Sequence, residues 1–166
     1  MKRYDITKYK ANQSGKDEWL GISDIGKIYD GIKLTSQEYK RFEDAYVNAI
    51  LEIIKYLNIT NVKIKNVYKC NIGKELEGRS SLRRKFYSKS ILQTYQSVDD
   101  YSVIGQEDLC NLIRLELRED IGGLLYVPYR LKIFIGYDFM MGVHCSKALE
   151  PIFEKIEELG LNIFQF

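Results

Sequence analysis

Residues 35–70 read TSQEYKRFEDAYVNAILEIIKYLNITNVKIKNVYKC, and two hydrophobic periods follow each other in this stretch. Apolar side chains first recur at steps of three and four residues, which places them on one face of a helix. Thr35 and Glu38 have the spacing of a capping box at the start of that helix. We therefore predict a helix over Ser36–Leu57. Its apolar stripe consists of Tyr39, Phe42, Tyr46, Ile50, Ile53 and Leu57.

The period then changes to two, which is typical of a strand with one buried and one solvated face. The alternation predicts a strand over Val62–Cys70. We expect Val62, Ile64, Tyr68 and Cys70 on the buried face, and Lys63, Lys65, Val67 and Lys69 on the solvated one.

The middle of the chain is harder to assign. Asn71–Gln106 is polar and basic at first and then rich in tyrosine and acidic residues, and its pattern fits no single element. After it, apolar positions predict a helix over Glu107–Arg118. Gly122-Gly123 is expected to end this helix, because glycine favours the conformation that follows a helix C-terminus.

The C-terminal part predicts the order strand, strand, helix, strand. The expected elements are strands over Leu131–Ile135 and Phe139–Cys145 joined by a turn at Gly136–Asp138, a helix that begins at Ser146 and is followed by Gly160, and a last strand over Leu161–Phe164. Strands interleaved with helices in this way indicate an α+β fold. We expect a single domain, residues 1–166, with a mixed or antiparallel sheet and two or three main helices.

Composition limits the class of protein. The chain has 166 residues, of which 45% are hydrophobic and 29% charged, and its net charge is +2. These values are ordinary for a globular protein and argue against disorder and against nucleic-acid binding through overall charge. The basic N-terminus lacks the apolar segment of a secretory signal, and no apolar run approaches the length of a membrane span. We expect a cytoplasmic protein with reduced thiols and no membrane partner.

One segment partly matches a phosphate-binding loop. Gly21–Lys27 fits the first seven positions of the P-loop pattern, but the eighth is Ile28, where a Ser or Thr hydroxyl should bind magnesium. Asp24 would also bring negative charge close to the phosphates. A short helix or turn is the better interpretation of this segment.

The candidate metal and nucleophile residues are few. His144 is the one histidine, and Cys70, Cys110 and Cys145 are the three cysteines. They lack the close pairing of zinc ligands, and adjacent His and Cys on a strand point to opposite faces. A Cys–His nucleophile pair is formally possible but has no local signature. We expect no enzyme activity, no metal and no cofactor.

Charge is segregated along the chain. Residues 61–98 carry nine basic and two acidic side chains, and residues 99–120 carry seven acidic and two basic ones. The basic stretch, with Phe86 and Tyr87 between its cations, could hold nucleic acid. The acidic stretch could instead dock on a basic protein, such as a nuclease. A solvated surface whose charges partly neutralise each other is the third interpretation.

Two groups of residues resemble a known family. The first comprises Trp19, Ile22-Ser23-Asp24-Ile25-Gly26, Gly31, Leu34-Thr35, Glu38-Tyr39, Glu43 and Tyr46, and the second comprises Gly136-Tyr137-Asp138-Phe139 and Gly160-Leu161. They resemble the two ends of bacterial immunity proteins that accompany polymorphic and contact-dependent growth-inhibition toxins. The resemblance covers about half of the chain, and Asn71–Gln106 has no counterpart in it.

The resemblance implies a non-enzymatic inhibitor that binds the C-terminal domain of its cognate toxin. Such toxins are often nucleases, including tRNA-cleaving ones. Combining this with the acidic stretch, we expect toxin contacts at Asp99, Asp100, Tyr101, Glu107 and Asp108. The alternative is an RNA-binding accessory protein that uses the basic stretch 63–89, although direct nucleic-acid binding is the less favoured prediction. The sequence leaves the oligomeric state open.

Overall fold

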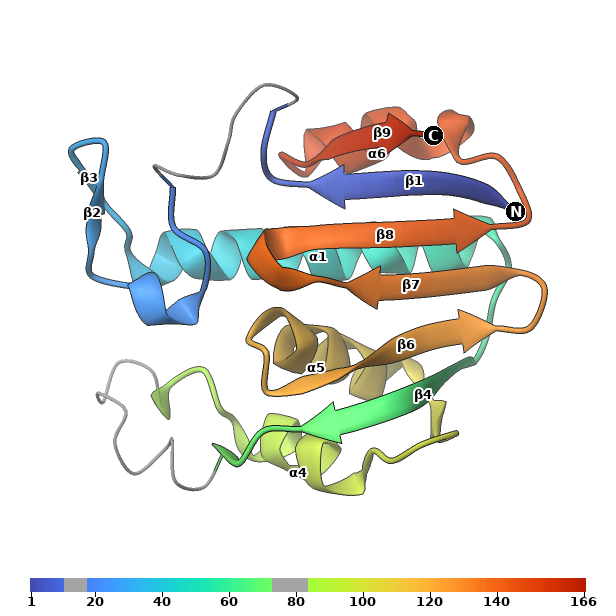
Figure 1. The fold of residues 1–166 in the computed structure, drawn as a ribbon, viewed down its shortest axis with the longest axis horizontal. Helices are drawn as coiled ribbons and strands as arrows, with labels where there is room; N and C mark the ends of the chain where they lie inside the picture. The colour runs from blue at the N-terminus through green and yellow to red at the C-terminus, as the bar shows by residue number, and fades with distance from the viewer. Residues whose placement is uncertain (11–17, 73–83) are drawn as a thin grey trace.

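The computed structural model describes residues 1–10, 18–72 and 84–166 as an antiparallel sheet with helices packed against it (Figure 1). The main sheet has seven strands in the order β5-β4-β6-β7-β8-β1-β9. These strands are β1 (Lys2–Thr7), β4 (Val62–Lys69), β5 (Val103–Ile104), β6 (Ile121–Val127), β7 (Leu131–Ile135), β8 (Met140–Cys145) and β9 (Asn162–Gln165). A separate small hairpin pairs β2 (Ile28–Tyr29) with β3 (Ile32–Lys33). The α+β prediction with an antiparallel sheet is confirmed.

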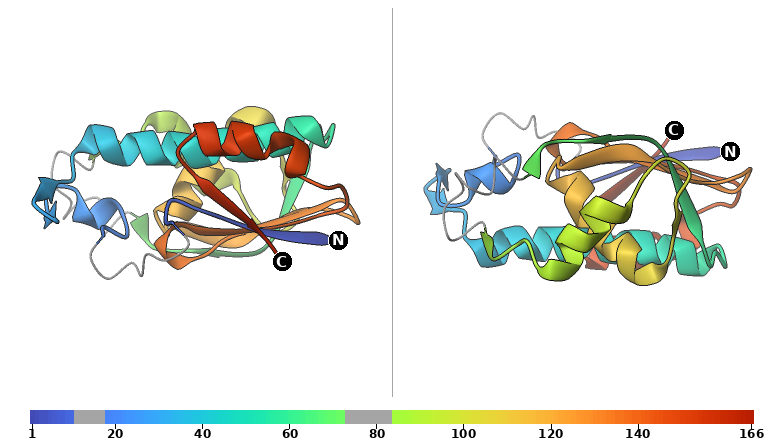
Figure 2. Two further views of the ribbon diagram at one scale, coloured as in Figure 1. Left: turned by 90° about the horizontal axis from the view of Figure 1, so that it is seen from above. Right: turned by 90° about the horizontal axis from the view of Figure 1, so that it is seen from below.

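The α-helices lie on one side of the sheet (Figure 2). In the described ranges they are α1 (Ser36–Tyr56), α4 (Lys89–Ser97), α5 (Gln106–Leu117) and α6 (Phe153–Glu158). The 3-10 turns described there are η2 (Ile22–Asp24), η3 (Tyr137–Phe139) and η4 (Glu150–Ile152). Within the described ranges no helix covers the other side of the main sheet. The fold is therefore two layers, with one sheet face buried and one open.

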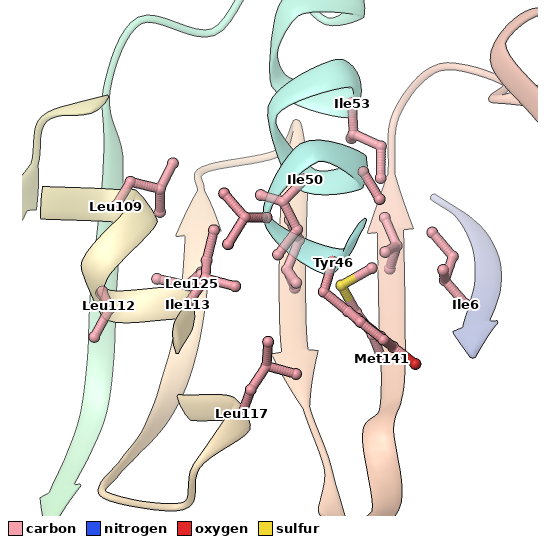
Figure 3. Close-up of a cluster of buried hydrophobic side chains, with 14 of the residues drawn as sticks. Ile6, Tyr46, Ile50, Ile53, Leu109, Leu112, Ile113, Leu117, Leu125 and Met141 are labelled. Atoms are coloured by element: carbon pink, nitrogen blue, oxygen red, sulfur yellow. The ribbon is translucent and has the colours of Figure 1, made fainter. Parts of the chain in front are cut away.

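The hydrophobic core fills the space between the helices and the sheet (Figure 3). From α1 come Tyr46, Ile50 and Ile53, and all three are completely buried. They meet side chains of α5 and of the strands, including Leu112, Ile113, Leu125, Met141 and Ile6. Each fully buried side chain of this size contributes roughly 1.5–3 kcal/mol through removal of apolar surface from water. The 3.6-residue stripe of α1 thus fixes which sheet face is covered.

At the start of α1, one of the two hydrogen bonds of the predicted capping box is present. Thr35 Oγ1 accepts a hydrogen bond from the Glu38 backbone N–H at 3.1 Å. The Glu38 carboxylate instead binds the Arg41 guanidinium, with Oε1 2.8 Å from Nη2. In a capping box the carboxylate at the Glu38 position would also accept a hydrogen bond from the Thr35 backbone N–H. This part of the prediction was wrong, because the Arg41 cation one turn further along the helix competes for the carboxylate.

Strand β4 follows the predicted alternation only to its middle. Val62 and Ile64 are buried as expected. The pairing with β6 then shifts between Lys65 and Tyr68, and Asn66 has a φ of 57°. This β-bulge reverses the faces, so Tyr68, predicted to be buried, is 58% exposed. A one-residue insertion is enough to move every later side chain to the opposite face.

The glycine pair after α5 does not end the helix. The helix ends at Leu117, and the turn uses Glu119 with a φ of 63°. Gly122 and Gly123 lie inside β6, a strand that the sequence did not predict. A Cβ at Gly122 would overlap the Tyr68 ring on the neighbouring strand. This close approach, rather than helix termination, accounts for glycine at that position.

Three further differences concern element boundaries. Ser146–Leu149 is not helical, and the helical segment begins at Glu150 with η4. Strand β1 was not predicted, and α4 and β5 lie inside the unassigned stretch Asn71–Gln106.

Among the described residues, no helix has both the length and the apolarity that crossing a bilayer requires.

Candidate functional site

The predicted contacts Asp99, Asp100 and Tyr101 form a tight turn beside β4, which we call the acidic turn. The Tyr101 N–H donates to the Ile64 carbonyl at 2.8 Å, and Asp100 Oδ1 accepts from the Val67 N–H at 2.8 Å. Tyr101 has a φ of 66° and is 68% exposed. The turn is therefore anchored to the sheet while the tyrosine ring projects into solvent.

Glu107 and Asp108 lie in the first turn of α5. Carboxylates are favourable there because the N-terminus of a helix carries partial positive charge. Asp108 Oδ1 also accepts a hydrogen bond from Thr94 Oγ1 at 3.0 Å, and this bond links α5 to α4. Glu107 and Asp108 lie three and four residues after the end of β5, and the acidic turn lies just before it. The structure therefore places all five predicted contact residues around this edge strand.

Not all of the acidic stretch is on the surface. Glu116 is 5% exposed and Asp120 is 1% exposed. Asp120 accepts a hydrogen bond from the Tyr87 hydroxyl, whereas neither carboxylate oxygen of Glu116 has a partner within the described chain. Burial raises the pKa of Glu116 well above its usual value. The acidic surface is consequently smaller than the charge count of residues 99–120 indicates.

The basic stretch 63–89 also does not form one surface. Lys63, Lys65 and Lys69 lie on β4, at the sheet. Arg84, Lys85 and Lys89 are exposed near the start of α4. Lys74, Arg79 and Arg83 lie outside the described residues. The cations that the sequence groups together are thus divided between two sides of the fold.

The open face of the sheet carries an arrangement that sequence reasoning missed. Strand pairing aligns five side chains in one row across β4, β6, β7, β8 and β1. The paired positions are Lys63 with Tyr126, Tyr126 with Lys132, Lys132 with His144, and His144 with Arg3. Cations and rings alternate along this row, which we call the cross-strand row. The predicted strands contained Lys63, Lys132 and His144, but only the register brings them together.

Aromatic rings also lie over glycines on this face. A Cβ at Gly142 would overlap the Phe134 ring, as one at Gly122 would overlap the Tyr68 ring. Phe134 is 42% exposed and packs edge-to-face on His144, with ring centroids 5.7 Å apart. Partial burial, together with the positive charges of Arg3 and Lys132, lowers the pKa of His144. His144 is therefore mostly neutral at pH 7.

A groove of about 550 Å³ lies between α1, α4 and α5. Arg114 and Arg118 line it, but both are paired internally. Arg118 Nε is 2.6 Å from Glu43 Oε1, and Arg114 Nη2 is 2.6 Å from Asp44 Oδ1. These two arginines hold α5 against α1.

Several of the residues behind the resemblance are buried in the fold, whereas Tyr137 is 73% exposed. Trp19 is 9% exposed, and its ring lies near those of Tyr39, Phe42 and Phe139 at centroid distances of 5.2–5.6 Å. The buried Lys8 ammonium sits 3.9 Å from the Trp19 ring centroid and donates to the Trp19 carbonyl at 2.8 Å. Burial is the main cause that lowers the pKa of Lys8. This cluster fixes the N-terminal segment on α1.

The other candidate residues are dispersed. Gly21–Lys27 contains η2, as the turn interpretation predicted, and Asp24 Oδ2 accepts from the Leu20 N–H at 2.8 Å. Cys145 faces the core and His144 faces outward, as predicted for neighbours on a strand. Within the described ranges, no three His, Cys, Asp or Glu side chains gather as metal ligands would.

Comparison with known proteins adds no relative. No family model matches the chain, and no curated protein or solved structure matches it either.

Proposed function

We propose that this chain is an immunity protein that binds and neutralises a cognate toxin domain, with the acidic turn as its docking site. The observation that supports the proposal is the exposure of Tyr101 on a turn whose backbone is anchored to β4. Exposed tyrosines held in a fixed geometry are typical anchors of protein interfaces, because little conformational entropy is lost when they bind.

The surroundings of Tyr101 fit a basic partner. The side chain of Asp99 is 83% exposed, and its contact with Lys69 at 3.4 Å is therefore weak. Glu107 is exposed as well. Val103, which lies between Asp99 and Glu107 in the sequence, is 59% exposed and adds apolar surface. Acidic groups around an aromatic anchor would steer the protein towards a positively charged surface, such as that of a nuclease.

The primary test is growth rescue. The protein is co-expressed with the C-terminal toxin domain encoded by the reading frame next to its own, and rescue from an otherwise lethal domain is expected. If the domain is lethal and this protein does not rescue growth, the proposed function is wrong for that partner.

The second test locates the docking site with the purified pair. Asp99→Lys combined with Glu107→Lys should slow association at least tenfold and reduce its dependence on salt. Tyr101→Ala should mainly accelerate dissociation. Glu157→Lys combined with Glu158→Lys on α6, and Tyr137→Ala at η3, are matched controls, since they make the same changes far from β5. Equal effects of the controls and of the acidic-turn variants would show that docking occurs elsewhere.

A further inference from the structure

The open face of the sheet carries a second surface feature, separate from the acidic turn. The cross-strand row alternates Lys63, Tyr126, Lys132, His144 and Arg3 over five adjacent strands. Neighbouring strands are ~4.8 Å apart, so the row extends over about 19 Å. Each cation therefore lies one strand away from a ring.

A second set of side chains widens this surface. Phe134 and Tyr68 lie over Gly142 and Gly122, which lets the rings rest on the backbone of the neighbouring strands. Lys65 adds a cation whose ammonium is 5.3 Å from the Tyr126 ring centroid. Together the two sets make a platform of rings interleaved with cations.

The charge of this platform is strongly positive. Arg3, Lys63, Lys65 and Lys132 contribute four positive charges, and none of them forms an ion pair within the described parts of the chain. The strand register puts one carboxylate among them, that of Asp5, opposite Gly142 and Phe164.

We infer that the open sheet face binds single-stranded RNA. The exposed rings would stack on bases, and the interleaved cations would contact phosphates, which is how sequence-tolerant single-strand binders combine the two interactions. A protein partner would favour an apolar centre with charges at the rim, whereas here the cations lie between the rings. Asp5 favours RNA over DNA, because a carboxylate can accept a hydrogen bond from a 2′-hydroxyl.

This inference does not depend on the proposed immunity function. Of the described part of the basic stretch 63–89, Lys63, Lys65 and Tyr68 lie on the open face, and the acidic turn is not part of that face. Tyr101→Ala should therefore weaken toxin binding and leave RNA binding unchanged, so failure of one proposal is distinguishable from failure of the other.

The experiment is fluorescence anisotropy with labelled oligouridine of about ten nucleotides, a length within the usual site sizes of single-strand binders. Binding is measured with the whole protein at about 50 mM and about 200 mM NaCl and is expected to weaken several-fold between them. Oligothymidine of the same length should bind more weakly, and Asp5→Asn should reduce this difference.

Two substitutions identify the surface. Phe134→Ala should weaken RNA binding about tenfold through loss of stacking. Lys132→Glu should weaken it at least as much and lower the salt dependence by about one phosphate contact. Lys155→Glu on α6, on the helix side of the fold, makes the same charge change and should have little effect. Circular dichroism establishes that each variant is folded, and Tyr126→Leu replaces Phe134→Ala if that variant is not.

Four outcomes would overturn the inference. They are absence of oligouridine binding at low salt, equal binding by folded open-face variants and wild type, and equal binding of oligothymidine. The fourth is competition by poly-glutamate: if poly-glutamate displaces RNA from wild type and from Phe134→Ala but not from Lys132→Glu, the face binds an acidic protein partner instead.

Discussion

Glu43 and Arg118 form a bidentate ion pair in the interior, with Arg118 Nε 2.6 Å from Glu43 Oε1 and Nη2 2.7 Å from Oε2. Their side chains are 1% and 2% exposed. Arg118 also donates to the Phe86 carbonyl at 2.6 Å. One guanidinium thus joins the middle of α1, the end of α5 and the segment that precedes α4.

Removal of the carboxylate from this pair should be costly. Glu43→Gln leaves a buried guanidinium without its counter-charge, and we expect a loss of about 3–5 kcal/mol in the free energy of unfolding. Glu38→Gln, which breaks the exposed pair with Arg41, should cost less than about 1 kcal/mol. Urea denaturation of both variants measures the difference. Similar losses for the two would mean that the interior pair is not held as described.

The buried Glu116 carboxyl should make stability depend on pH. Its folded pKa lies above the usual 4.5, so the folded state holds a proton that the unfolded state releases. The contribution of this carboxyl to stability is then fully present below pH 4.5, and it falls by up to ~1.4 kcal/mol per pH unit as pH rises towards the folded pKa. Glu116→Gln does not titrate. As pH rises, the unfolding free energy of the wild type should therefore fall relative to that of Glu116→Gln. A difference between the two proteins that stays constant with pH would contradict this prediction.

Tyr46 and Tyr9 offer a matched pair of hydroxyl deletions. The Tyr46 hydroxyl accepts from the Lys8 N–H at 2.9 Å and donates to the Phe139 carbonyl. Tyr46→Phe leaves both backbone groups unsatisfied and should cost about 1–3 kcal/mol. The buried Tyr9 hydroxyl has no partner among the described residues, so Tyr9→Phe should be neutral or stabilising. Thermal unfolding compares them, and equal destabilisation would refute the assigned bonds.

A double-mutant cycle tests the ring that lies over Gly142. Gly142→Ala places a methyl group where the Phe134 ring lies, and the displacement should cost about 1–3 kcal/mol. In the Phe134→Ala background the same substitution should cost much less, because the space is open. The coupling free energy from chemical denaturation should therefore differ from zero by more than about 0.5 kcal/mol. Additive losses would place the ring elsewhere.

His144 reports on the charge of the open face. Its pKa is lowered by partial burial first, and then by Arg3 and Lys132. Lys132→Ala removes one positive charge and should raise the pKa of His144, as followed by NMR titration of the imidazole C–H signals. Lys155→Ala, on the opposite side of the sheet, should leave it unchanged. If the pKa of His144 were lowered or unchanged in Lys132→Ala, Lys132 and His144 would not lie close together as described.

Long periodic segments were the most predictable part of the fold. The stripe of α1 and the alternation of Leu131, Ile133, Met141 and Val143 were confirmed because periodicity reports directly on burial. Strand β4 was predicted only as far as its bulge, since a single residue with positive φ leaves no mark on the hydrophobic pattern. Gly122 was misinterpreted because its partner, the Tyr68 ring, is distant in sequence.

Of the two candidate sites, the one formed by residues close together in the sequence was the more predictable. The five toxin-contact residues were chosen from a local cluster of charges, and the structure places them around β5, three of them in a turn that the sequence did not predict. Their toxin contacts stay a prediction. The cross-strand row could not be predicted, because Arg3 and His144 meet only through the pairing of β1 with β8. A surface of this kind requires the register of five strands, and no single segment of the sequence contains it.

The position of β1 has a consequence for synthesis of the chain. This strand lies between β8 and β9, and Lys2 pairs with Cys145. During translation β1 therefore leaves the ribosome long before β8 and β9, and its backbone groups stay unpaired until those strands are made. Such long-range closure is entropically expensive and folds slowly. Until then the exposed edges of β1 are open to other chains, and nascent-chain chaperones are the factors expected to protect them.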